Sequence, residues 1–150
     1  MKAFLESIQA KLGEVTEIKY IDEDWGQLDE FSPNSPVQWP CCLFDISTVN
    51  YSDTGLDRLL VPQNRQEGAA NITLTFANMK LTNTSFKAPQ TQKDNVWSFH
   101  DIIELAHAKL HAWSPVAGSG KLIRKSFKRV KRDDGIQQYE VVYAIKFQNV

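Results

Sequence analysis

Two cysteines are all that this 150-residue sequence contains, and they are neighbours, Cys41 and Cys42. Adjacent residues of a strand point to opposite faces, so these thiols cannot easily share one metal ion, and a disulfide between them would be strained. No C-x-x-C spacing and no second cysteine pair accompany them. We therefore expect both thiols to be packed in the core, as free cysteine usually is.

Long apolar runs are also missing. The sequence has no stretch of 18 apolar residues, which predicts that no segment spans a membrane. The N-terminal stretch reaches Glu6 before its apolar residues are numerous enough for a signal peptide. We expect an intracellular protein that makes no contact with a membrane.

The motifs of common enzymes are absent. There is no G-x-S-x-G nucleophile elbow, and the "GSGK" of residues 118–121 does not have the spacing of a phosphate-binding loop. Nothing in the sequence specifies a catalytic residue or a cofactor. We expect that the protein is not an enzyme and uses no cofactor.

The composition, 42% hydrophobic and 23% charged, predicts one globular domain over residues 1–150. The net charge of −1 conceals an asymmetry: residues 1–60 hold four Lys/Arg against eleven Asp/Glu, and residues 61–150 hold thirteen against seven. Such a chain can present acidic and basic surfaces on opposite sides. That distribution suits head-to-tail self-association as well as nucleic-acid binding, with solvated and internally paired charges as the simplest alternative.

Hydrophobic periodicity and turn residues predict the elements before the second helix. The chain should begin with a helix over 1–13, a strand over 14–21 and an acidic loop over 22–36. There follow a strand over 37–47 that is buried on both faces, an irregular segment over 47–64 and a half-buried strand over 71–78. The second helix is expected to begin at a cap formed by Asp94 or Asn95 and to end at Ser114, before Pro115. Its apolar stripe consists of Phe99, Ile103, Ala106, Leu110 and Trp113.

A β-hairpin is predicted for the C-terminal segment. Its three-residue loop is Asp133-Asp134-Gly135, with Gly135 left-handed, and its closing strand has the apolar face Tyr139, Val141, Tyr143, Ile145 and Phe147. In this register Phe127 is opposite Val141 and Ile123 is opposite Ile145, whereas a two-residue loop would move Phe127 to the other face. The predicted order is α-β-β-β-α-β-β, a mainly antiparallel sheet packed by two helices, of the α+β class.

The first strand of this hairpin is rich in cations. The candidate interface residues are Arg124, Lys125, Lys128, Arg129, Lys131 and Arg132. Lys and Arg at a sheet edge prevent stray strand pairing, so a solvated edge is one interpretation. A surface for protein assembly is the second. A nucleic-acid surface, with Tyr139 and Tyr143 as stacking partners, is the third, although no recognised nucleic-acid motif is present.

The histidines form a separate candidate site. His100, Glu104, His107 and His111 line one stripe of the second helix, and Glu104-x-x-His107 is a pattern used in di-iron helical bundles. Such sites need carboxylates from several facing helices, and only two helices are predicted here. We therefore expect a half-exposed or interface-lining flank and no native metal site, with a metal enzyme as the less favoured alternative.

Several segments, in this order, resemble the tail terminator (tail completion) proteins of long-tailed bacteriophages and prophage-like elements. The segments are "FLESIQAKL", "WPCCLFDI", "NRQEGAANITLTFA", "VWSFHDIIELAHAKLHAW" and "RVKRDDGIQQYEVVYAIKF". The likeness spans nearly the whole chain and rests on the order of patterns. The long segments 47–64 and 78–95 depart from the compact family pattern.

The resemblance implies a structural virion-assembly protein. In that family, a homo-oligomeric ring of six copies docks on the last layer of the tail tube, ends tube polymerisation and provides a surface for the head-completion protein. DNA passes through the bore without sequence readout. The resemblance also implies assembly in the host cytoplasm, followed by a place in the virion tail.

Overall fold

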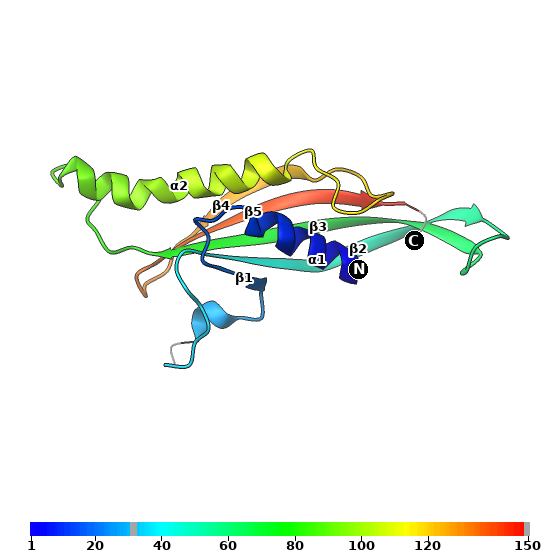
Figure 1. Cartoon of the computed structure of the whole chain (residues 1–150), viewed down its shortest axis with the longest axis horizontal. Helices are drawn as coiled ribbons and strands as arrows, with labels where there is room; N and C mark the ends of the chain where they lie inside the picture. The colour runs from blue at the N-terminus through cyan, green and yellow to red at the C-terminus, as the bar shows by residue number, and fades with distance from the viewer. Residues whose placement is uncertain (31–32, 149–150) are drawn as a thin grey trace.

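In the computed structural model, which describes residues 1–30 and 33–148, the described chain forms two α-helices and one five-stranded sheet (Figure 1). The elements are α1 (Lys2–Gly13), β1 (Tyr20–Glu23), the short 3-10 helix η1 (Gln27–Asp29), β2 (Cys41–Leu56), β3 (Asn64–Met79), α2 (Gln90–Leu110), β4 (Ile123–Val130) and β5 (Ile136–Phe147). The sheet order is β1-β2-β3-β5-β4, with β1 parallel to β2 and every other pair antiparallel. The predicted α+β class and order of elements are confirmed.

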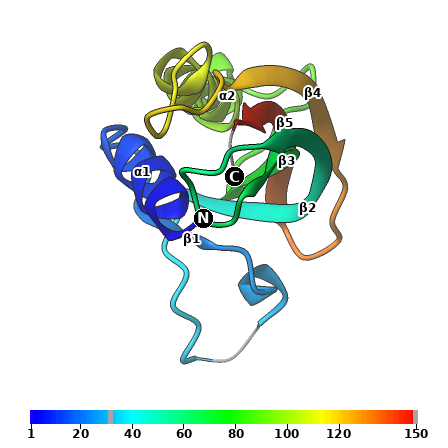
Figure 2. The same cartoon turned by 90° about the vertical axis from the view of Figure 1, so that its right-hand side faces the viewer.

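Both helices pack on the same face of the sheet, which we call the inner face (Figure 2). α1 buries Phe4, Ile8 and Leu12 there, since these residues recur every four positions along one helical stripe. The five apolar residues predicted for the closing strand are all buried in the same core. Between the helices, Lys109 of α2 lies 3.2 Å from Glu14.

The opposite face, the outer face, is covered only in part. The segment over 24–30 and 33–40 lies against one end of it, where Leu28 packs with Cys41 and Leu43. Cys42 points the other way, into the inner core, and both cysteines are fully buried. This confirms the prediction that adjacent thiols on one strand are packed on opposite faces.

The prediction of an irregular segment over 47–64 is wrong except for residues 57–63, which form the turn between β2 and β3. β2 and β3 are each 16 residues long and extend far beyond the other strands as a two-stranded ribbon (Figure 1). β5 pairs with β3 only as far as Gly68, so residues 52–67, here called the arm, pair only with one another. Gly55 has φ +120° and lies at a β-bulge of this ribbon.

Other boundaries also differ from those predicted. The first strand comprises only Tyr20–Glu23. Before it, the chain makes two turns, closed by hydrogen bonds from Val15 N–H to Leu12 and from Ile18 N–H to Val15. These turns bury Val15 and Ile18, which strand pairing was expected to do. α2 begins at Gln90, before the expected cap. The sequence did not reveal this start, because residues 90–95 are all polar and carry no hydrophobic signal. It ends at Leu110, before Ser114. No helix among the described residues is both long and apolar enough to cross a membrane.

The C-terminal hairpin has the predicted left-handed glycine and most of the predicted register. Its connection spans residues 131–135, because β4 ends at Val130 and β5 begins at Ile136, and is therefore longer than the predicted three-residue loop. Gly135 has φ +79°, and Phe127 is paired with Val141. A bulge between Arg124 and Ser126 shifts the rest by one residue, so Ile123 is opposite Ala144 and not Ile145. The bulge leaves Lys125 unpaired and lets it line the outer face, as described below.

Candidate assembly interface

The sheet has two open edges of different character. Among the described residues, no strand pairs with β4 on the side away from β5. At the other edge, β1 covers only Cys41–Phe44 of β2, so the rest of β2 up to Leu56 has one side that no described strand pairs with. Unpaired backbone groups along an edge are a template for another strand. Both edges are therefore available to a partner chain.

The two edges carry opposite charges. β4 contains four cations and no carboxylate, whereas β2 contains Asp45 and Asp53 and no cation. β2 and β4 also run in opposite directions, because three antiparallel pairings separate them. An edge of one copy could therefore meet the other edge of a second copy with antiparallel strands and complementary charge.

The six predicted interface residues have different surroundings. Arg124 is held by its own chain: its guanidinium lies 3.1 Å from Glu104 of α2. Lys125, Lys128, Arg129 and Lys131 are exposed. Lys128 is opposite Glu140 in the strand register, on the outer face, and Arg129 is opposite Tyr139 on the inner face. Four of the six cations are thus free to meet a partner.

Arg132 is not a projecting cation. Its Nη2 lies 2.6 Å from Asp134 and 2.7 Å from Asp29, and its Nη1 donates to Gln138 at 3.0 Å. The side chain is only 15% exposed. The hydrogen bonds to Asp134 and Asp29 raise the pKa of Arg132, and the same contact with Arg132 lowers the pKa of Asp134. Arg132 therefore fastens the hairpin turn to the segment around Asp29.

Aromatic residues of the hairpin lie under α2 and not on the surface. Tyr139 and Tyr143 are 6% and 2% exposed, so the expectation that they could stack on bases is wrong. Phe127, by contrast, is 47% exposed and stacks on Tyr139 at a centroid distance of 5.2 Å. The hairpin therefore offers at most one accessible aromatic ring beside its cations.

The histidine stripe packs on the hairpin. His107 Nδ1 lies 2.8 Å from the hydroxyl of Tyr143, and His111 Nδ1 accepts the backbone N–H of Arg124 at 3.3 Å. Burial and the charge of Arg124 lower the pKa of His107, while burial raises the pKa of Tyr143 to about 12. The described residues contain no group of three His, Cys, Asp or Glu side chains that could hold a metal ion.

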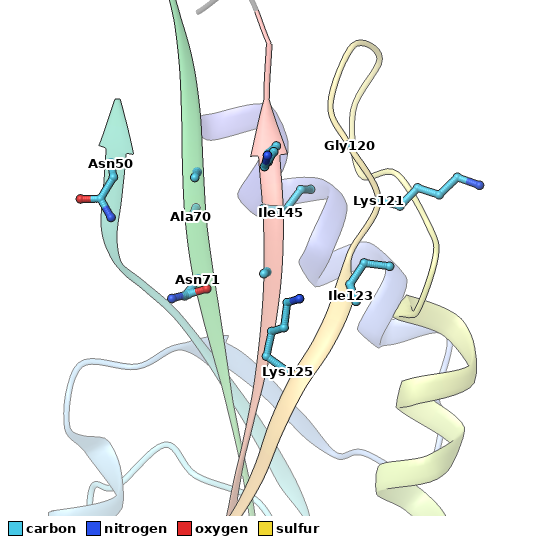
Figure 3. Close-up of a pocket in the computed structure, with 11 residues that line it drawn as sticks. Asn50, Ala70, Asn71, Gly120, Lys121, Ile123, Lys125 and Ile145 are labelled. Atoms are coloured by element: carbon cyan, nitrogen blue, oxygen red, sulfur yellow. The ribbon is translucent and has the colours of Figure 1, made fainter. Parts of the chain in front are cut away.

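The uncovered part of the outer face is hollowed near the start of β4 (Figure 3). The depression has a volume of about 460 Å³ and lies over small and aliphatic residues, among them Ala69, Ala144 and Ile123. Lys121, Lys125 and Lys146 also line it, together with the amides of Asn50 and Asn71, and no carboxylate of the described residues does. It is thus a shallow apolar site with a cationic margin.

The arm ends in an exposed apolar group, here called the arm tip: Leu56, Leu59, Leu60 and Val61. Leu59 and Val61 are each 94% exposed, and Leu56 is 68% exposed. No residue of 52–67 is buried. Exposed apolar clusters on a projecting element are typical of contact surfaces.

The comparisons with known proteins identify the fold and not a family. No model of a known protein family matches the chain, and no curated protein sequence matches it. Among solved structures, a chain from the "Virion of native gene transfer agent (GTA) particle" matches with a TM-score of 0.52 and 10% sequence identity. The match covers 97% of this chain and 92% of that chain. The two chains share one fold over nearly their whole length.

Two features of this surface were missed by sequence reasoning. The arm was missed because its sequence lacks the alternation of apolar and polar residues by which a half-buried strand is predicted. The depression was missed because it is formed by residues from β2, β3, β4 and β5 that come together only in the sheet. The sequence offered one signal for the depression: the small residues Ala69, Asn71 and Thr73 alternate with the buried apolar residues of β3.

Proposed function

We propose that this protein is a structural virion protein of a phage-like particle, specifically a tail terminator that forms a ring on the end of the tail tube. Two independent observations support the proposal. The sequence resembles that family in the order of its segments, and the fold matches, over 97% of the chain, a chain from a gene transfer agent virion. The protein would act through contacts with other chains, without catalysis or a cofactor.

The observation that supports ring formation is that the two open edges of the sheet are opposite in charge and in strand direction. When the β4 edge of one copy meets the free β2 edge of the next, the contact is heterologous, and repeated heterologous contacts close into a ring if the rotation per copy allows it. The cations Lys125, Lys128 and Arg129 then lie near Asp45 and Asp53 of the neighbour. We infer six copies from the family resemblance.

The remaining partners follow from the same resemblance. One side of the ring would dock on the last layer of tail tube protein and end its polymerisation, and the other would receive the head-completion protein. DNA would pass through the bore without sequence readout. Assembly would take place in the host cytoplasm, and the finished ring would remain in the virion tail.

Sedimentation over a concentration series, with and without purified tail tubes, tests this function, and negative-stain images of the tube ends locate the protein. We expect the protein to form rings, either free in solution or on the ends of the tail tubes. The double change Lys128→Glu and Arg129→Glu should reduce ring formation, because it reverses the charge of the β4 edge. Lys2→Glu and Lys87→Glu, which reverse two exposed cations elsewhere, are the matched control. A protein that stays monomeric and is not recruited by tubes would contradict the proposal.

A further inference from the structure

We propose that the arm tip of one copy docks into the outer-face depression of the next copy. The inference rests on the proposed ring and adds the partner surface for its longest projection. It assigns a shared role to the two features of the described surface that the sequence did not predict, the exposed apolar tip and the cation-lined hollow.

The arm gains little stability from its own chain. Residues 52–67 form a two-stranded ribbon of which no residue is buried, and such a ribbon alone is marginally stable in water. Three of the four apolar side chains at its tip are more than half exposed. A partner that covers Leu59 and Val61 would remove this apolar area from water, which is the main favourable term in association.

The depression has the chemistry to receive such a tip. Its floor, with Ala69, Ala144 and Ile123, is apolar and made of small or aliphatic side chains, so another aliphatic side chain can approach the sheet closely. Ile123 is 38% exposed in the single chain and would be covered as well. The volume of about 460 Å³ lies within the range of sites that hold small apolar groups.

The direction of the strands brings these surfaces together. In the antiparallel contact between β4 of one copy and β2 of the next, the neighbour's β2 runs toward the first residue of β4, Ile123. When β2 pairs with β4 up to Leu56, its last residue, the arm tip that follows lies beside Ile123. The depression lies at that end of β4, beside Lys121 and Ile123.

Charge favours the same arrangement. Lys121, Lys125 and Lys146 line the depression, and among residues 1–30 and 33–148 no carboxylate joins them. The arm contains Asp53, Asp57 and Glu67 against Arg58 and Arg65, so its net charge is −1. The phosphates of DNA could also attract the three lysines, but they would leave the apolar floor and the apolar tip uncovered. A second copy satisfies both surfaces.

Site-directed cross-linking tests the contact. One chain carries Val61→Cys and a second carries Ile123→Cys; Cys41 and Cys42 are fully buried and do not compete in the folded protein. Mixed on tail tubes or in free rings, the two chains should give a cross-linked dimer with a short bismaleimide, and neither chain alone should. Val61→Cys mixed with Ser98→Cys, on α2 of the inner-face side, is the matched control and should give none.

A second set of variants measures the contribution of the arm tip. Leu59→Ser with Val61→Ser should raise the concentration for half-assembly by about tenfold or more, since apolar burial of two side chains is lost. Leu81→Ser with Phe86→Ser, at two positions that are also more than 80% exposed but lie outside the arm, should leave the concentration for half-assembly unchanged.

The outcomes separate this inference from the proposed function. Rings that form normally but give no 61–123 cross-link would overturn the docking and leave the ring standing. Absence of rings both in solution and on tubes would overturn both. If Lys125→Gln with Lys146→Gln weakens retention of a DNA duplex while the cross-link is absent, the depression serves DNA and the docking is overturned.

Discussion

Arg132 donates hydrogen bonds of 2.9 Å and 2.6 Å, from Nε and Nη2, to the same carboxylate oxygen of Asp134. Both residues lie in the connection between β4 and β5, and the guanidinium also donates to Asp29 at 2.7 Å. A residue that the sequence marked as an interface cation is thus part of the fold of its own chain. Substitution of Arg132 should therefore lower the stability of the fold, whereas substitution of an exposed cation of β4, such as Arg129, should affect it little.

The change Arg132→Ala should lower the free energy of unfolding by roughly 1.5–3 kcal/mol, the range for hydrogen bonds to charged groups. Arg129→Ala, at an exposed position of β4, should change it by less than about 0.5 kcal/mol. Urea unfolding followed by circular dichroism measures both. Equal stability of the two variants would show that the contacts of Arg132 contribute nothing to the fold.

The sequence predicted the hairpin well because its signals are local. Gly135 is needed for a left-handed turn position, and alternation from Tyr139 to Phe147 marks the buried face of the strand. The bulge at Lys125 could not be predicted, since it depends on how β4 meets α2 and β5 together. Likewise, Arg132 read as a free cation because its partner Asp29 is about a hundred residues away in the sequence.

The candidate site could be predicted only in part for a related reason. Charge enrichment located the β4 edge, and four of the six candidate cations are exposed. The complementary edge was not found, because the polar segment over 47–64 has the composition of a loop although it forms strands. Backbone pairing between β2 and β3 determines that segment, and pairing leaves little trace in polar sequence.

The pH dependence of stability should depend on His107. Its pKa is lowered in the folded protein, chiefly by burial, so the unfolded chain takes up the proton first as the pH falls. The folded state therefore loses stability below about pH 6.5, the ordinary value for histidine, and keeps it above. His107→Gln should make the melting temperature less sensitive to a change from pH 7.5 to pH 5. An unchanged pH dependence would contradict this role for His107.

The two thiols should be unreactive in the native protein. Burial raises the pKa of Cys41 to about 12 and holds the pKa of Cys42 well above its ordinary value, and only the thiolate reacts readily. With an aromatic disulfide reagent at pH 8, we expect no colour from the folded protein and two equivalents of thiol in denaturant. Reaction of one equivalent in the native state would show that a face of β2 opens locally.

Gly55→Ala should loosen the arm without weakening the domain. Gly55 has φ +120°, a conformation in which a side chain is strained by about 1–3 kcal/mol, yet a Cβ there meets no atom within 4 Å. Because the arm buries nothing in the core, the melting temperature should stay the same while amide hydrogen exchange rises in residues 52–67. Gly13→Ala, at the end of α1 where φ is not positive and the space is also open, is the matched control and should leave exchange in the arm unchanged. If Gly55→Ala instead lowers the melting temperature of the whole domain, the arm is coupled to the core. The ribbon would then be a structural part of the single chain, and its extension would no longer point to a partner.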